Sequence, residues 1–142
     1  MKLQAHIPIA LTVSVATYFI FRSIETSIWC FIAGIFIDLD HLFDYFVTEG
    51  IKFDIKDFFD KCYRCELKKY YIVLHSYEFI AILILVTCLV KLNLLLGLTI
   101  GITTHFLLDI FSNPKHLLVY SFIHRLNCNF DAAKLPFKNA QK

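Results

Sequence analysis

Nine histidine, aspartate and glutamate side chains lie in the interiors of four apolar segments of this sequence, away from the first two and last two residues of each. They are His6, Asp38, Asp40, His41, Asp44, His75, Glu78, His105 and Asp109. Several stand three or four residues apart, as His105 and Asp109 do, and this spacing places two side chains on one face of a helix. Imidazole nitrogens and carboxylate oxygens are ligands that suit zinc, iron and manganese. The set therefore predicts a divalent metal site, holding one or two ions, between helices.

The segments that would position these side chains are long and apolar. Of the 142 residues, 58% are hydrophobic and 18% are charged, whereas soluble domains are about 45–50% apolar and about 25% charged. This composition disfavours a soluble enzyme, a disordered chain and a disulfide-stabilised secreted domain. Segments 3–21, 24–47, 70–90 and 93–112 each have the roughly 20 residues that cross a bilayer as a helix. We predict one all-α integral-membrane domain over residues 1–142, a bundle of about four transmembrane helices.

The basic residues are distributed unequally between the two sides of such a bundle. Twelve of the 14 lie before the first segment, in loop 48–69 or after residue 112, and the other two are Arg22 and Lys91. Because basic residues favour the cytoplasmic side, we expect cytoplasmic termini in an inner (plasma) membrane protein. Loop 48–69 has apolar residues at helical spacing, which predicts an amphipathic helix on the membrane surface. The apolar part of 115–142 is too short to span and is expected to be interfacial.

Under this topology most of the ionisable groups lie at one depth. They fall within about 5–14 Å of the cytoplasmic helix ends, given a rise of about 1.5 Å per residue. A charge at mid-membrane costs at least about 2.5–3.5 kcal/mol, so such groups indicate partners and a function. The spacing of Gly97 and Gly101 further predicts that another helix approaches closely beside His105 and Asp109.

Each ionisable group has an expected role in this site. The predicted metal ligands are His75, His105, Asp109 and Asp38, followed by His41 and His6. Glu78 or Asp40 is expected to act as the catalytic base or to orient a ligating imidazole. Asp44 is also compatible with an interfacial carboxylate that pairs with a lysine. Interhelical hydrogen bonds without a metal are the structural alternative for the whole set.

At these residues the chain resembles a known family. The stretches 34–41 (GIFIDLDH), 74–76 (LHS) and 104–109 (THFLLD), with His6 before them, resemble the LexA-binding, inner-membrane-associated hydrolases of the YdjM type. That family is described as membrane-bound and metal-dependent, with distant similarity to zinc-dependent phospholipase C and the zinc single-strand nucleases. The resemblance implies that His6, Asp38, His41, His75, His105 and Asp109 are ligands. The chain departs from the family pattern at Ile37, where proline is frequent, and at 70–71, where a His-Arg pair is frequent.

These observations predict a membrane-bound, metal-dependent hydrolase. A metal-activated water, most simply on zinc, with iron or manganese as alternatives, would attack a phosphoester or a lipid-linked substrate at the cytoplasmic side. The lipid bilayer is the expected partner, and acidic residues among the basic ones of loop 48–69 leave no nucleic-acid signature.

Two other classes of protein could use the same residues. One is an ion- or proton-coupled transporter that uses the His and Asp groups as a relay. The outer halves of the segments carry few polar residues, which disfavours a continuous path. The other is a bis-histidine haem protein using His75 and His105, although the neighbouring carboxylates suit a bare metal ion better.

Overall fold

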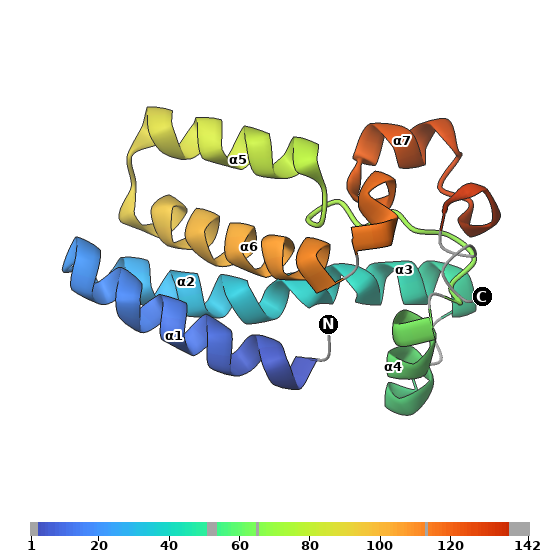
Figure 1. Ribbon diagram of the computed structural model, residues 1–142, viewed down its shortest axis with the longest axis horizontal. Coiled ribbons are helices and arrows are strands. Elements are labelled where there is room, and N and C mark those ends of the chain that lie inside the picture. Colours follow the sequence, from blue (N-terminus) through green and yellow to red (C-terminus); the bar gives the residue numbers. More distant parts are fainter. Residues whose placement is uncertain (1–2, 51–53, 65, 113, 137–142) are drawn as a thin grey trace. The chain divides into compact units, whose positions relative to one another are not determined.

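The structure, a computed structural model, describes residues 3–50, 54–64, 66–112 and 114–136 (Figure 1). These residues form helices and connecting segments, and within them the only extended pairing is an isolated bridge between Lys69 and Asp131. The predicted all-α class is therefore confirmed. The chain divides into two compact units. The first unit comprises residues 1–37 and 79–113, and the second comprises 38–78 and 114–142.

The first unit is built from α1 (Leu3–Phe21), α2 (Ile24–Phe36), most of α5 (Tyr77–Val90) and α6 (Asn93–Ser112). Helix α2 packs against both α1 and α6 (Figure 1). The hydroxyls of Thr87 and Thr99 lie 2.6 Å apart and join α5 to α6. The turns after α1 and α5 use Arg22 and Lys91, whose φ angles are 53° and 54°.

The close approach predicted at Gly97 and Gly101 is present, and the partner helix is α2. A Cβ atom on Gly101 would overlap the carbonyl oxygen of Cys30, and one on Gly97 would overlap that of Thr26. Only hydrogen at these two positions lets the α6 backbone reach the α2 backbone. This contact fixes the place of the next turns of α6, which carry His105 and Asp109.

The second unit consists of shorter helices. It contains η1 (Ile37–Leu39, whose first residue ends the first unit), α3 (Asp40–Glu49), α4 (Ile55–Arg64), η2 (Pro114–Tyr120), α7 (Phe122–Asn127) and η3 (Ala132–Lys134). Its hydrophobic core is formed by Tyr45, Phe58, Leu67, Tyr70, Ile72 and Leu135. Because residues from both chain segments meet in this core, 114–136 belongs to a folded unit and is more than a surface segment.

Two of the expected spans differ from the helices that form. The expected helix 24–47 is divided into α2, η1 and α3, and the new helix starts at Asp40, a residue type that favours a first turn. The expected helix 70–90 begins only at Tyr77. In its first part, which is not helical, α3 carboxylates accept the backbone N–H groups of Tyr71 and Leu74.

One described helix, α6, is long and apolar enough to cross a membrane, whereas His6–Phe21 and Tyr77–Val90 are apolar but shorter. Large apolar side chains are nevertheless exposed on the first unit, among them Ile20, Leu89 and Phe111, which are 72%, 72% and 77% exposed. The four-span bundle therefore stays a prediction.

The amphipathic helix predicted in loop 48–69 corresponds to α4. Its Phe58 is buried against Tyr45, with ring centroids 5.5 Å apart. On its polar side, Lys61 binds Glu49 and Asp57 at 2.8 and 3.0 Å. Part of its apolar face thus contacts protein. Residues 51–53, 65 and 137–142 of the two predicted interfacial segments lie outside the described residues.

Candidate metal centre

Three of the predicted ligands meet in the first unit. His6 lies near the start of α1, and His105 and Asp109 lie one turn apart near the end of α6. The two imidazoles stack with their centroids 3.9 Å apart and their planes 8° from parallel. Each faces a different oxygen of Asp109, at 3.4 Å for His6 Nε2 and 3.5 Å for His105 Nε2. We call His6, His105 and Asp109 the first cluster.

The orientation of His105 is fixed from the other side of its ring. Nδ1 lies 2.7 Å from the carbonyl oxygen of Gly34 on α2, and because a carbonyl can only accept, Nδ1 carries the hydrogen. A neutral ring then presents the lone pair of Nε2 to the Asp109 carboxylate. Ligating histidines in proteins characteristically have their second ring nitrogen bound in this way. Sequence spacing paired His105 with Asp109 but could not identify Gly34 as the acceptor.

The nitrogen–oxygen separations test whether a metal ion fits. Separations of 3.4 and 3.5 Å exceed the usual 2.7–3.2 Å of an N–H···O hydrogen bond. Two ligands about 2.0–2.2 Å from a tetrahedral zinc ion are separated by about 3.3–3.5 Å. The nitrogen–oxygen separations of the first cluster are therefore compatible with the edges of a zinc coordination sphere.

A small cavity adjoins the two stacked imidazoles within the first unit. Its lining includes His6, His105, Thr104 and the small residues Gly34 and Gly101. Its volume of about 10 Å³ is enough for about one water molecule. The first cluster consequently has space beside its ligands for a water molecule.

A second group of predicted ligands meets in the second unit around His75, which is 1% exposed. Its Nε2 lies 3.6 Å from an oxygen of Asp38, and its Nδ1 lies 3.5 Å from an oxygen of Asp40. The His41 ring centroid is 5.0 Å from that of His75. We call Asp38, Asp40, His41 and His75 the second cluster. Asp40 is placed to orient the ring, while Asp38 and Nε2 are placed to hold an ion.

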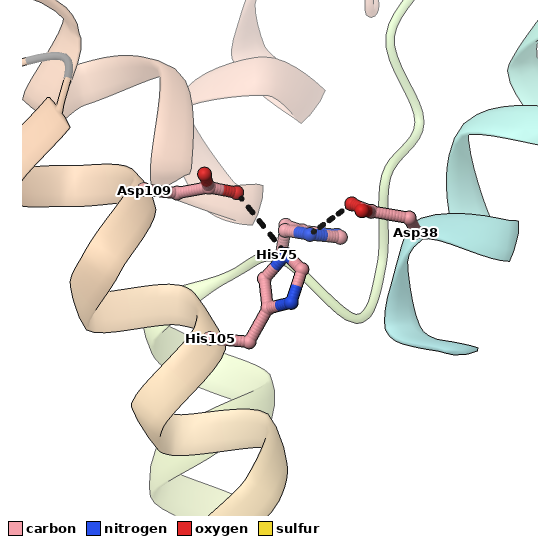
Figure 2. Close-up of side chains that lie close together, drawn as sticks. All are labelled: Asp38, His75, His105 and Asp109. Carbon is pink, nitrogen blue, oxygen red and sulfur yellow. Dashed lines mark ion pairs between the residues drawn. The ribbon is translucent and has the colours of Figure 1, made fainter. Parts of the chain in front are cut away.

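Each unit thus carries a histidine with a carboxylate opposite its Nε2, and these groups could hold a metal ion. Figure 2 draws the two pairs, His105 with Asp109 and His75 with Asp38, and marks each ion pair. All six predicted ligands fall into one cluster or the other. The described residues therefore include the groups that could hold the predicted metal ion.

Glu78, predicted as a catalytic base, lies elsewhere in the second unit. One of its oxygens accepts from the Ser121 hydroxyl at 2.7 Å and the other from the Phe122 N–H at 2.8 Å. It also accepts from the N–H of Ile123. These groups form the first turn of α7, so Glu78 caps that helix, and its oxygens are occupied by structural hydrogen bonds.

Sequence analysis did not single out Arg125, and it left Asp44 open between a member of the site and an interfacial carboxylate that pairs with a lysine. Arg125, placed in an interfacial segment, is fully buried and donates to backbone carbonyls. Burial lowers the pKa of Arg125, while Asp40, Asp44 and Glu78 act in the opposite direction. Asp44 is also fully buried and accepts from the backbone of Tyr71, with no lysine contact among the described residues. A lone basic residue in an apolar stretch was the available signal for Arg125.

Comparison with protein-family models, with curated proteins and with solved structures found no match. The function must therefore be argued from the site itself.

Proposed function

We propose that this chain is a membrane-embedded, metal-dependent hydrolase whose metal ligands come from the two His–Asp clusters. The observation that carries the proposal is the geometry of the first cluster. His105 is oriented by the Gly34 carbonyl, and Asp109 offers one oxygen to each of two stacked imidazoles. His105, whose Nδ1 carries the hydrogen, turns the lone pair of Nε2 toward the Asp109 carboxylate, and a divalent ion between the two would bind both.

The residues have separate tasks in this proposal. His6, His105 and Asp109 hold one ion, and Asp38, His41 and His75 hold an ion in the second unit. Asp40 keeps the His75 ring in register by facing Nδ1 at 3.5 Å. A bound zinc, iron or manganese ion supplies Lewis-acid chemistry and lowers the pKa of water toward neutrality. The small cavity beside His6 and His105 has room for such a water.

The apolar surface of the first unit supports a membrane location. Soluble monomers rarely expose large contiguous apolar patches, yet α1 and α5 expose Phe19, Ile20, Ile82, Leu85 and Leu89, each by more than half. The basic-residue distribution supports cytoplasmic termini for such a protein in the inner membrane. Clusters at headgroup depth would suit a phosphoester of a lipid or a lipid-linked substrate.

The test is metal analysis of the detergent-purified protein together with its visible spectrum. We expect one or two equivalents of zinc, iron or manganese, and no haem absorption. His105→Ala should lose the ion of the first cluster while the helical circular dichroism is retained. His124→Ala, which removes a histidine outside both clusters, is the matched control and should keep the full metal content.

The same preparation separates the other functional classes. A haem band would identify a haem protein, and a metal-free protein that moves protons across vesicles would identify a transporter. Hydrolysis of a simple phosphodiester or of a phospholipid in mixed micelles, abolished by His105→Ala, would support the hydrolase. A metal content unchanged by His105→Ala would overturn the proposed site.

A further inference from the structure

Residues 71–75 lead into α5 and end at His75, yet their backbone is held by side chains instead of helical hydrogen bonds. The N–H of Tyr71 donates to Asp44 Oδ1 at 3.0 Å, and the N–H of Leu74 donates to Asp40 Oδ2 at 2.7 Å. Both carboxylates belong to α3. Helix α3 thus provides acceptors for the donors of this segment.

Arg125 provides donors for the carbonyl groups of the same segment. Its guanidinium donates through Nη2 to the Ile72 carbonyl at 2.7 Å and through Nη1 to the His75 carbonyl at 3.4 Å. Nη1 also donates to the Val119 carbonyl at 3.0 Å. The planar guanidinium has donors in a fixed arrangement, which a lysine cannot reproduce. Arg125 therefore ties the segment to η2 at two separate carbonyls.

The backbone that these groups hold is strained at Ile72. Its φ angle is +27°, a value that a β-branched residue rarely adopts. Such a conformation persists only where the surroundings over-determine it. At Ile72 they do so, because the carbonyl is bound by Arg125 and the N–H lies 3.5 Å from Asp44 Oδ1.

We propose that Arg125 is a positioning residue that, with Asp40 and Asp44, fixes residues 71–75 and thereby aims the imidazole of His75. The statement that Arg125 positions a metal ligand rests on the proposed function, in which His75 binds an ion. The orientation of the ring does not rest on it, because His75 faces Asp40 and Asp38 without a metal ion. The buried guanidinium of Arg125 binds the carbonyls of Ile72 and His75 and therefore acts on the His75 ring through the backbone.

The experiment uses the full chain in detergent with its histidines labelled with ¹⁵N in the ring. Arg125→Lys keeps the charge and removes the planar set of donors, and Arg22→Lys is the control at an exposed arginine of the first unit. In the metal-free parent protein, the ring ¹⁵N signals of His75 should report a single tautomer with Nδ1 protonated. In Arg125→Lys the ring should exchange between its two tautomers, so these signals should be averaged. On titration with zinc, Arg125→Lys should weaken binding at His75 by ~10–100-fold, whereas the His6 and His105 signals should titrate as in the parent protein.

The outcomes separate this proposal from the proposed function. If the parent protein binds no zinc, the proposed metal site is wrong. The effect of Arg125→Lys on the metal-free His75 signals then still tests whether Arg125 positions the ring. Zinc binding and His75 signals that are unchanged in Arg125→Lys overturn the positioning and leave the metal site standing. Equal loss at all three histidines also overturns it, since that pattern indicates a general structural role.

A second pair of variants repeats the test if Arg125→Lys does not fold. Asp44→Asn keeps an oxygen that accepts from the Tyr71 N–H, and Asp44→Ala does not. The His75 tautomer should be preserved in Asp44→Asn and averaged in Asp44→Ala. Identical His75 signals in the two variants would contradict the positioning.

Discussion

His105 donates its Nδ1–H to the carbonyl of Gly34 across 2.7 Å, a hydrogen bond that joins residues 71 positions apart. It fixes which nitrogen of His105 faces Asp109 and so determines which atom can bind an ion. The bond is possible because Gly101 lets α6 lie directly against α2. The packing of α6 on α2 in the first unit therefore also sets the orientation of the His105 ring.

Asp109→Asn should abolish tight metal binding at the first cluster. The carboxylate faces both His6 and His105, and the amide has the same shape without the charge. Because loss of groups that merely orient a ligand costs ~10–100-fold in affinity, loss of this ligand should cost at least ~100-fold. Zinc titration monitored by isothermal calorimetry checks this, with the exposed Asp60→Asn as control. Equal affinity in Asp109→Asn and the parent protein would exclude Asp109 as a ligand.

Gly101→Ala should destabilise the first unit by about 1–3 kcal/mol, the usual cost of overpacking. The new Cβ would overlap the Cys30 carbonyl, which is backbone and cannot rotate away. Gly34→Ala is the matched comparison, since its Cβ would lie 3.2 Å from the Cβ of Ala10 and should cost less. Unfolding in mixed detergent, followed by circular dichroism, measures both. A Gly101→Ala protein as stable as the parent would contradict the close packing of α2 on α6.

Glu78→Gln distinguishes the cap seen in the structure from the catalytic base predicted from sequence. The amide replaces one accepting oxygen with a donor, so the first turn of α7 loses a partner. We expect a loss of about 0.5–2 kcal/mol in stability, as for other helix caps, with unchanged zinc content. Thermal denaturation and metal analysis measure these, and the exposed Glu66→Gln is the control. Loss of phosphoesterase activity at unchanged stability would restore the role of base.

Asp57→Asn should destabilise the second unit in a pH-dependent way. The Tyr45 hydroxyl at 2.7 Å and the Lys61 ammonium at 3.0 Å hold the pKa of Asp57 below its ordinary value. A carboxyl whose pKa is lowered on folding stabilises the protein above its unfolded pKa, about 3.9, and this contribution is lost as the pH falls through the folded pKa. The difference from the parent should therefore be largest near neutral pH and should shrink in acid. Melting curves of the two proteins at neutral and at acidic pH check this, and a stability difference that does not change with pH would contradict it.

One pair of the candidate site was predictable because it is local in the sequence. The separation of four residues puts His105 and Asp109 on one face of any helix, and the structure has them 3.5 Å apart. The spacing of Gly97 and Gly101 likewise predicted a close helix contact, and the apolar periodicity of 55–64 predicted α4. All three follow from the 3.6-residue period alone.

The partners of those residues were not predictable in the same way. Asp44, Glu78 and Arg125 all bind backbone groups at least 27 residues away or in another helix. Every residue has backbone N–H and C=O groups, so no side-chain pattern marks which of them a carboxylate or guanidinium will meet. For the same reason the hydropathy of 70–90 gave no sign that residues 71–75 would leave the helix.

The helical class, the apolar character and the supply of imidazole and carboxylate groups are set by composition and short-range spacing, which are properties of the chain. The grouping of these side chains into a His–Asp cluster in each of two units, and the capping of a helix by Glu78, arise only on folding. Such assignments depend on which distant backbone groups become neighbours, and packing of the whole chain settles that.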